Sequence, residues 1–294
     1  MFNENRYRAS VIIPTYNRGE LLRSTLQSLL TQSIDKNEFE VIVIDDGSSD
    51  HTKEVVISFE NEMNLKYVYQ YDKGFRVARA RNLGVSLCEA PICIFIDSGL
   101  LLSPDCLYHH IHPHESATQP LAVIGYVAGF SQNDHNNESI KQALQTADRH
   151  QMFTALINRS DFNDIREACY LKYNDEIGKL PAPWVLFWAG NVSVSTAMVN
   201  KVKGFDENYM SWGVEDVDFG YALHLQGAEF RLCREALSIH FPHEKDELDH
   251  RRTSHDNRLY FHHKYQSRET ELLISTRCLD MNDLLLNLNC PTTE

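Results

Sequence analysis

Three carboxylates lie within four positions of the chain, shortly after a Trp-Gly pair. The run from Trp212 to Asp218 reads WGVEDVD, so Glu215, Asp216 and Asp218 are close enough to repel one another. A helix N-terminus, a cation or a substrate must compensate that repulsion. The following residues predict a helix, in which consecutive side chains point about 100° apart, so Glu215 and Asp216 can have separate roles. We expect the helix dipole to keep a carboxylate in the first turn ionised at neutral pH, as a general base requires.

Two apolar segments near the N-terminus end in polar residues. The first ends in PTYNR, from Pro14 to Arg18, and the second in DDGSSD, which begins at Asp45. Adjacent strand ends of this composition can form a polar pocket for a base and a ribose, with Asp46 as hydrogen-bond acceptor and Tyr16 as stacking surface. The DDGSSD segment is also open to a purely structural role, because turns and helix caps favour the same residues.

Four cations are concentrated around the start of a predicted helix, in the segment DKGFRVARARN from Asp72 to Asn82. Free backbone N–H groups and the helix dipole favour anions there, so the segment is a candidate diphosphate site. Arg76 and Arg79 share one helix face, whereas Arg81 lies about 200° round from Arg79, so only part of the cluster can meet one ligand. A solvated basic face is the alternative interpretation.

Candidate metal ligands follow two other apolar segments. Asp97 comes directly after the run 92–96, where a carboxylate could hold a divalent cation. His240 and His243 lie in the segment IHFPH and could reach the same cation. A second histidine group, HHIHPH at 109–114, has no partner motif that would indicate a metal site, and we interpret it as a surface loop.

Alternating strands and helices must position these residues. The alternation consists of apolar runs and amphipathic helical patterns, in the order 10–13, 22–30, 41–44, 52–62, 67–70, 77–87 and 92–96. Uniformly apolar strands favour a parallel sheet covered on both faces, and such sheets bind ligands beyond the carboxyl ends of their strands. The predicted fold class is therefore α/β. The pattern also predicts a strand at 121–127, a helix at 138–158 and helices within 244–294.

The charge balance limits the partners. The 294 residues include 28 Lys and Arg and 41 Asp and Glu, so the net charge is 28 − 41 = −13. This field repels polyanions, so we expect no nucleic-acid partner, and an anionic ligand must be attracted by local cations or a metal. No apolar run reaches the roughly 20 residues of a membrane helix, and the N-terminus lacks a signal peptide. We therefore expect a cytoplasmic protein, with peripheral contact at the inner membrane face as an option.

The same segments, taken in order, resemble a known family. They are VIIPTYNR, VIVIDDGSSD, GFRVARARNLG, FIDSG, FWAGNVSVS, VKGFDENYMSWGVEDVDFGYAL and IHFPH, within residues 10–243. The chain resembles the family 2 glycosyltransferases of GT-A fold. Its second half is similar to the galactosyltransferase-type C-terminal motif of bacterial chondroitin polymerases and animal β-1,4-galactosyltransferases. The resemblance implies a Rossmann-like, mostly parallel sheet flanked by helices. It also implies inverting transfer of a hexose or N-acetylhexosamine from a nucleotide sugar, most often a UDP-sugar, to an acceptor hydroxyl.

The resemblance further implies roles for individual residues. Asp216 would be the general base, Glu215 would hydrogen-bond the sugar, and Trp212 would pack against it. Gly190 and Asn191 fall where related enzymes shape the sugar pocket. The nucleotide-sugar site would be lined by Pro14, Thr15, Tyr16, Arg18, Asp46, Arg76, Arg81, Asp97 and Ser98.

One departure from the family concerns the metal. The family signature is Asp-x-Asp, whereas this sequence has Asp97-Ser98-Gly99 and lacks the second carboxylate. Either Asp97 and His240 hold Mn²⁺ or Mg²⁺ with diphosphate oxygens and water, with His243 a weaker candidate, or arginines replace the metal. The departure also leaves open a catalytically weakened nucleotide-sugar-binding or scaffold protein. A nicotinamide-dependent dehydrogenase is disfavoured, because no Gly-x-Gly-x-x-Gly turn follows the first strand.

The simplest layout is one domain over residues 1–245, followed by a tail. Its nucleotide-binding half would cover about 1–125 and its acceptor and catalytic half 126–245. Residues 246–294 would form a helical C-terminal tail with a locally basic composition. The tail is a candidate surface for a homo-oligomer or for a membrane-linked acceptor. The acceptor itself stays open between a glycan, a lipid-linked sugar and a small molecule.

Overall fold

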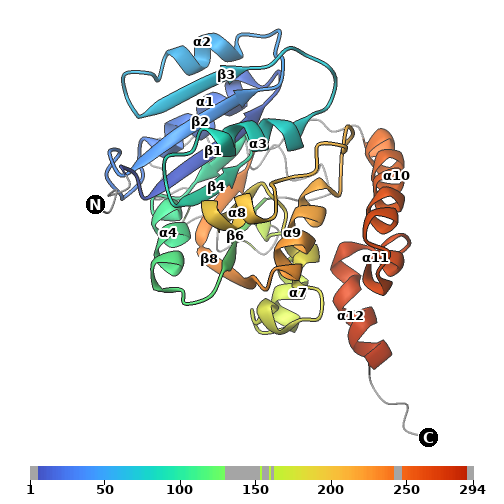
Figure 1. Cartoon of the computed structure of the whole chain (residues 1–294). Coiled ribbons are helices and arrows are strands. Elements are labelled where there is room, and N and C mark those ends of the chain that lie inside the picture. Colours follow the sequence, from blue (N-terminus) through green and yellow to red (C-terminus); the bar gives the residue numbers. More distant parts are fainter. Residues whose placement is uncertain (1–5, 130–152, 154–158, 160–161, 242–246, 290–294) are drawn as a thin grey trace, which may run out of the picture.

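The computed structural model describes residues 6–129, 153, 159, 162–241 and 247–289 (Figure 1). Its strands form one eight-stranded sheet in the order β3-β2-β1-β4-β7-β6-β8-β5. They are β1 Ala9–Thr15, β2 Phe39–Asp45, β3 Leu65–Tyr69, β4 Ile92–Ile96, β5 Leu100–Leu102, β6 Leu121–Ala128, β7 Asn191–Ser195 and β8 Glu229–His240. The pairs β1/β2, β1/β4, β2/β3 and β6/β8 are parallel. The pairs β4/β7, β6/β7 and β5/β8 are antiparallel, so the sheet is mixed with a parallel majority.

Helices cover both faces of the sheet (Figure 1). On one face Val11 packs in a cluster with Leu26 and Leu107, and on the other Phe95 packs in a cluster with Phe219. The described helices are α1 Gly19–Leu29, α2 Thr52–Ile57, α3 Val77–Ser86, α4 Cys106–Ser116, α7 Glu167–Lys172, α8 Thr196–Lys201, α9 Glu215–Leu225, α10 Glu247–Tyr265, α11 Arg268–Leu273 and α12 Cys278–Asn289, with 3₁₀ turns η3 Ile177–Lys179 and η4 Pro183–Leu186. Burial on both faces explains why the strands are uniformly apolar.

The N-terminal half follows the predicted alternation of strands and helices. Each apolar run coincides with a strand to within a few residues. Gly84 of α3 lies directly on β1, since a Cβ there would come within 2.5 Å of Ile12. The predicted helix at 52–62 is shorter, because α2 ends at Ile57 and the Ser58 hydroxyl donates to the Val55 carbonyl at 2.6 Å. Turns follow in place of further helix.

The parallel strands determine where a ligand can bind. β1 lies between β2 and β4, while α1 and α3 contribute to the hydrophobic clusters on opposite faces. This is a topological switch point, at which the carboxyl ends of the strands leave room for a ligand. Thr15, Asp46 and Asp97 lie at or just after the ends of β1, β2 and β4. The topology therefore brings these three predicted residues to one edge of the sheet.

The histidine group at 109–114 lies in a helix, so its interpretation as a surface loop is wrong. His110 of α4 is buried, with Nε2 2.8 Å from Oδ1 of Asn191 and Nδ1 3.1 Å from Oγ of Ser193. His114, one helical turn later, has Nε2 2.9 Å from the same hydroxyl. Desolvation lowers the pKa of both histidines to about 4. They form a neutral polar contact between α4 and β7.

The C-terminal tail is helical, as predicted, and α10, α11 and α12 lie along one side of the molecule (Figure 1). Phe261 packs edge-on against Trp184 and Tyr221, with ring centroids 5.8 and 5.5 Å apart. Leu273 and Met281 belong to the same hydrophobic cluster, so the tail shares the core of the second half. None of the helices that the structure describes is long and apolar enough to cross a membrane. Apart from residue 153, the predicted helix at 138–158 lies outside the described residues.

Candidate functional site

The ends of β1 and β2 carry the residues predicted to hold a base and a ribose. Thr15 pairs with Asp45, and the Asp46 N–H donates to the Thr15 carbonyl at 2.8 Å. Thr15 Oγ1 is buried without a hydrogen-bond partner in the described part of the chain, so it is available to a ligand. Tyr16 is 46% exposed, and its hydroxyl donates to Asp72 at 3.0 Å. We call this region, together with Asp97 after β4, the nucleotide edge; it consists of Thr15, Tyr16, Arg18, Asp46, Arg76 and Asp97.

Pro14 and Ser98, two further predicted residues, are buried at this edge. Pro14 lies in β1 beyond Ile12, the last β1 residue in the ladder with β4. Its missing N–H therefore removes no hydrogen bond from that ladder. Ser98 is 6% exposed and follows Asp97. Both side chains lie beneath the surface of the edge.

Arg76 pairs with Asp46 just after the end of β2. Its Nη2 donates to Oδ1 of Asp46 at 2.9 Å, and its backbone N–H donates to Oδ2 at 2.9 Å. Gln70 also donates to Oδ1, at 2.5 Å. Desolvation raises the pKa of Asp46, although the bonds from Arg76 and Gln70 oppose the rise. A buried carboxylate needs such a counter-charge, and Arg76 supplies it; the assignment of Arg76 to the nucleotide-sugar site stays a prediction.

Arg81 joins two parts of the chain that are 134 residues apart. Nη1 donates to Glu215 at 3.1 Å, and Nη2 donates to Asp97 at 3.0 Å. Arg81 is 3% exposed, and its guanidinium lies 5.3 Å from the Phe205 ring centroid. Burial lowers the pKa of Arg81, but the charges of Asp97, Glu215 and Asp216 outweigh burial and raise it overall. A permanent cation therefore links the end of β4 to the start of α9.

Arg18 is a half-buried cation next to the nucleotide edge. It directly precedes α1, and its guanidinium makes no hydrogen bond or ion pair with other described residues. Desolvation lowers its pKa, and the charge of Asp97 opposes that shift. A partly desolvated guanidinium without a close counter-ion favours binding of an anion. Of the predicted cations, Arg18 is thus better placed for a diphosphate than Arg76 or Arg81, whose carboxylate partners are already present.

The segment 211–216, which we call the catalytic turn after the role predicted for Asp216, has an unusual backbone. Gly213 has φ +101° and Val214 has φ +77°. The left-handed conformation costs a residue with a side chain roughly 1–2 kcal/mol, and it is rare for a β-branched residue. Strain of this kind persists only where the surrounding structure holds it, often at functional sites. Trp212, just before these residues, is 45% exposed.

Asp216 lies in the first turn of α9, beside Glu215. Its Oδ1 accepts from the Val217 N–H at 2.8 Å, and it also accepts from the Ala189 backbone. Desolvation and the charge of Glu215 nevertheless raise the pKa of Asp216 to about 7. The expectation that Asp216 stays fully ionised at neutral pH is therefore corrected, because burial and a like charge outweigh the helix N-terminus. A carboxylate with this pKa can accept and release a proton near pH 7.

Asp218, the third carboxylate of the motif, points away from Asp216. It is 2% exposed and accepts from Tyr209 at 2.8 Å, Lys264 at 2.8 Å and Tyr265 at 3.1 Å. The repulsion expected among the three carboxylates is thus relieved for Asp218, which has its own partners. Asp218 attaches α9 to the tail.

Gly190 and Asn191 have different places in the structure. The Gly190 carbonyl accepts from the Asp97 N–H at 2.9 Å, and a Cβ on Gly190 would lie 3.2 Å from Asp97 Oδ2. Asn191 is 1% exposed, and its Nδ2 donates to the Ala236 carbonyl at 2.9 Å and to the Ser238 hydroxyl at 3.1 Å. Its amide also contacts His110, as described above. Asn191 therefore joins strands inside the sheet, and its part in shaping the sugar pocket stays a prediction.

The described residues alone do not form a complete metal site. His240 ends β8 opposite Leu100, and the Phe241 N–H donates to the Gly99 carbonyl at 2.9 Å. His240 thus lies beside the position at which the family signature has its second Asp. No group of three His, Cys, Asp or Glu side chains in the described ranges could hold a metal. His243 lies outside the described residues.

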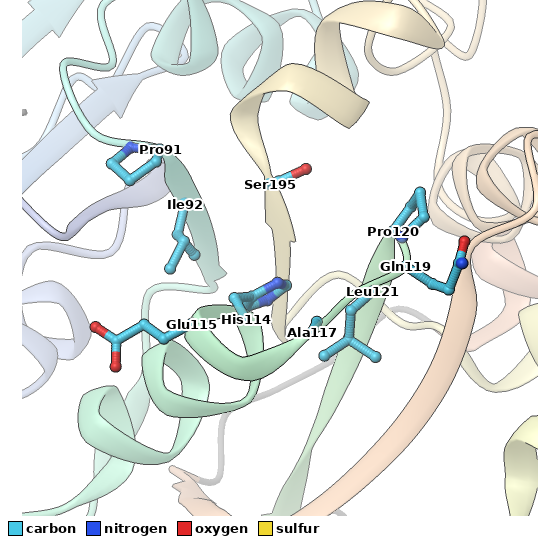
Figure 2. A pocket seen from close by; sticks show the side chains of 9 residues that line it. All are labelled: Pro91, Ile92, His114, Glu115, Ala117, Gln119, Pro120, Leu121 and Ser195. Atoms are coloured by element: carbon cyan, nitrogen blue, oxygen red, sulfur yellow. The ribbon is translucent and has the colours of Figure 1, made fainter. Parts of the chain in front are cut away.

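A pocket of about 390 Å³ lies at the other end of the sheet (Figure 2). Ile92 starts β4, Leu121 starts β6 and Ser195 ends β7, so the pocket lies away from Asp97. Figure 2 shows His114 and Glu115 of α4 at its lining. None of the predicted catalytic or nucleotide-binding residues lines it. The arrangement of side chains, and not this pocket, therefore defines the candidate site.

Sequence reasoning missed two residues that hold the site in place. Gln70 directly follows β3, and its side chain donates a hydrogen bond to Asp46. Asn257 of α10 donates to the Gly213 carbonyl of the catalytic turn at 2.7 Å. The position of Gln70 next to a predicted strand end was a usable signal, because ligands bind at such ends. A single asparagine within a polar helix carries no comparable signal.

Comparisons with known proteins identify the family and the fold of the chain. A sequence profile described as glycosyl transferase family 2 matches residues 10–170, more than half of the chain. The chain belongs to glycosyl transferase family 2. A second profile, described as the N-terminal domain of galactosyltransferase, matches residues 178–245, which contain the catalytic turn.

This family 2 chain is also similar to named relatives. It is 36% identical over 236 residues to validoxylamine A glucosyltransferase of Streptomyces hygroscopicus subsp. jinggangensis, covering 80% of this chain and 56% of that protein. It is 28% identical over 262 residues to the chondroitin synthase of Escherichia coli, covering 82% of this chain and 36% of that protein. The chain thus spans between one third and a little over half of these relatives.

Solved structures support the fold of the family 2 chain. S. aureus TarS 1-349 in complex with UDP-GlcNAc matches with a TM-score of 0.61 at 17% identity, covering 96% of this chain and 74% of that chain. The mannosyltransferase PcManGT from Pyrobaculum calidifontis, in complex with GDP-Man and Mn²⁺, matches with a TM-score of 0.58 at 14% identity, covering 96% and 75%. At these identities the likeness establishes the GT-A fold, as the sequence predicted.

Proposed function

We propose that the chain transfers a hexose or N-acetylhexosamine from a UDP-sugar to an acceptor hydroxyl, with inversion at C1 and with Asp216 as general base. The observation that carries this proposal is the bridge from Asp97 through Arg81 to Glu215, at 3.0 and 3.1 Å. It brings the segment after β4 and the catalytic turn into one site at the switch point of the sheet. The glucosyltransferase name of one relative and the UDP-GlcNAc bound by a protein of the same fold support the substrate class.

The nucleotide edge would bind the donor. Tyr16 offers an exposed ring for stacking on the base, and Thr15 and Asp46 offer hydrogen bonds to base and ribose. Arg76 orients Asp46 by its ion pair at 2.9 Å. Arg18 would contact the diphosphate, because its guanidinium is partly desolvated and has no close partner among the described residues.

The catalytic turn would carry the chemistry. Trp212 would pack against the sugar, and Glu215 would accept a hydrogen bond from it. Asp216 would take the proton of the acceptor hydroxyl while the acceptor oxygen attacks C1 opposite the departing UDP. A base of pKa about 7 suits this step near neutral pH. The Arg81 guanidinium holds the Glu215 side chain in place by a hydrogen bond at 3.1 Å.

A divalent cation is a separate part of the proposal. Asp97 and His240 would supply two ligands, and the donor diphosphate and water would have to supply the others, as Mg²⁺ sites often require. A bound cation would neutralise charge on the departing diphosphate. We expect that Mn²⁺ added to chelator-treated protein raises its affinity for UDP, measured by calorimetry. An unchanged affinity and rate would remove Asp97 and His240 as ligands and leave the diphosphate to arginines.

The central experiment compares Asp216→Asn with the unaltered chain. Asparagine keeps the shape but cannot accept the acceptor proton, so we expect turnover to fall by about 10²–10⁴-fold. The affinity for UDP and the melting temperature should stay the same, which separates loss of chemistry from loss of folding. Undiminished turnover in this variant would remove Asp216 as the base.

The second candidate function is a nucleotide-sugar-binding or scaffold protein, favoured by the missing carboxylate at Gly99. It predicts UDP binding without transfer to any acceptor. A donor screen by mass spectrometry, with water as the acceptor, distinguishes the two functions and identifies the sugar. Slow hydrolysis of one UDP-sugar would support transfer, whereas binding without hydrolysis or transfer would support the scaffold.

The proposal also concerns the acceptor, the cellular location and the oligomeric state. A glycan, a lipid-linked sugar or a small molecule would each present the required hydroxyl. We propose a cytoplasmic site of action, with membrane contact only through a lipid-linked acceptor. A homo-oligomer through the tail would have to use its outer surface, because Phe261, Leu273 and Met281 are buried in the core of their own chain.

A further inference from the structure

Asn257 of α10 holds the backbone of the catalytic turn. Its Nδ2 lies 2.7 Å from the carbonyl oxygen of Gly213, 3.2 Å from that of Ser211 and 3.3 Å from that of Trp212. The Ser211 hydroxyl donates to its Oδ1 at 3.3 Å. Asn257 is 8% exposed and 44 residues away from Gly213 along the chain. One amide group thus serves three successive carbonyls, which its two N–H donors must share.

Thr253, one helical turn before Asn257, supports the same segment. Its hydroxyl donates to the Trp212 carbonyl at 3.1 Å. Residues four apart lie on the same face of a helix, so both side chains point at the turn from one surface of α10. The fit is close, because a Cβ on Gly213 would lie 3.3 Å from the Ser254 side chain. The left-handed conformations of Gly213 and Val214 are therefore held from outside α9.

The helix that carries Asn257 is itself fixed to α9. Lys264 of α10 donates to Asp218 of α9 at 2.8 Å and to Asp206 at 2.8 Å. Phe261 is buried against Trp184. In Figure 1, α10 lies beside the part of the molecule that contains α9. The orientation of α10 is thus set independently of the bonds to the turn.

We propose that Asn257 is a positioning residue for sugar transfer. By holding the carbonyls of residues 211–213, it sets the direction of the Trp212 indole and of the first turn of α9, from which Glu215 and Asp216 reach donor and acceptor. This inference rests on the proposed transferase function. It places a determinant of transfer beyond residue 245, where both sequence profiles have ended.

The test compares Asn257→Ala with Asn282→Ala in the full chain. Asn282 of α12 is a buried asparagine, 1% exposed, that bonds to the backbone of Ala182, at 2.8 and 3.1 Å, away from the turn. We expect Asn257→Ala to lower kcat by about 10- to 100-fold, since small misplacements of catalytic groups have effects of this size. KM for the donor and the affinity for UDP should change by less than about twofold, because the nucleotide edge is untouched. Asn282→Ala should lose stability but keep its kcat.

Hydrogen exchange gives a second readout that does not depend on activity. Asn257→Ala should speed exchange of the backbone amides of residues 212–217, and Asn282→Ala should not. If Asn257→Ala does not fold, Thr253→Val removes one bond to the turn with little change of shape, and we expect the same effects in weaker form.

The outcomes separate the two proposals. An equal loss of kcat in both asparagine variants, or unchanged exchange in the turn, would overturn the positioning role. If Asn257→Ala speeds exchange in the turn but the unaltered chain has no transferase activity, the proposed function is contradicted. The role of Asn257 in transfer is then contradicted with it. A fall in kcat with faster exchange only in Asn257→Ala would support both.

Discussion

The nucleotide edge and the catalytic turn face the same site but are held in different ways. At the nucleotide edge, Asp46 is bonded by Gln70 and Arg76, 24 and 30 residues away along the chain. In the catalytic turn, Gly213 is held by Asn257 of the C-terminal tail, and Glu215 is held by Arg81, 134 residues away. One region is built from successive strand and helix units, whereas the other depends on distant parts of the fold.

From this difference we expect the nucleotide edge to govern donor binding and the catalytic turn to govern turnover. Changes at the nucleotide edge should alter donor affinity, because its side chains would meet base, ribose and diphosphate. Changes around the catalytic turn should alter turnover, because they move Asp216 or change its charge. Arg81 belongs to both regions, since it contacts Asp97 and Glu215 together.

The largest effect should follow Arg81→Met, which removes the link between the two regions. Glu215 would stay buried without a counter-charge, and breaking a buried pair in this way costs about 3–5 kcal/mol. We expect a loss of free energy of unfolding toward the lower end of that range, because Asp97 is half exposed, together with loss of transfer. Urea denaturation measures the first effect.

The control for this variant is Arg79→Met on the same helix. Arg79 is exposed, and surface substitutions usually change the free energy of unfolding by less than about 0.5 kcal/mol. Adding Glu215→Gln to Arg81→Met should restore part of the lost stability by removing the uncompensated charge. Equal stability of Arg81→Met and the unaltered chain would mean that the two regions are not coupled through this guanidinium.

The pH dependence of kcat/KM and of UDP affinity should also distinguish the two regions. Asp216 must be deprotonated to act as base, and its pKa is raised to about 7 by desolvation and Glu215. The value of kcat/KM should therefore fall with decreasing pH below about 7, by about tenfold for each further unit. UDP affinity should vary little between about pH 6.5 and 8, because Asp216 would not contact the nucleotide. A rate that stays constant down to about pH 5 would contradict the raised pKa.

Arg76→Gln should affect transfer less, and only through donor binding, although it should also lower stability because the buried Asp46 loses its counter-charge. Without its ion pair, Asp46 keeps only Gln70 and a backbone N–H to orient it. We expect KM for the donor to rise about tenfold, with kcat changed by less than about twofold, as loss of uniform binding predicts. Lys73→Gln, in the exposed loop before Arg76, is the matched charge control. A lower kcat at unchanged KM would place Arg76 in the chemical step instead.

Gly190→Ala should produce the smallest effect, where the two regions meet. The new Cβ would lie 3.2 Å from Asp97 Oδ2, so the carboxylate must shift by a few tenths of an ångström. Asp97 is half exposed and can move, so we expect a loss of only about two- to fivefold in kcat/KM, well under about 1.4 kcal/mol. A loss above tenfold in steady-state assays would show that the position of Asp97 is rigidly required.

Features that depend on the local sequence were predicted correctly, whereas features that depend on packing between distant segments were not. The strands and helices of the first half were predicted because their apolar patterns are local, and the strand ends then brought Thr15, Asp46 and Asp97 to one edge. The burial of Asn191 was not predicted and the histidines of α4 were misplaced, because both depend on packing between α4 and β7. The charge state expected for Asp216 was wrong because local helix geometry does not include desolvation by the rest of the fold. The role of His243 stays a prediction.

The sequence by itself determined the family, the α/β layers and the place of the catalytic motif at a helix start. These features depend on residue type, spacing and strand direction, which act over short distances along the chain. Only the tertiary structure decided that Arg81 pairs with both Asp97 and Glu215, and that a tail residue holds the turn before Asp216. Such contacts depend on side-chain positions that converge after the sheet and the C-terminal helices have packed together, so spacing along the chain does not encode them.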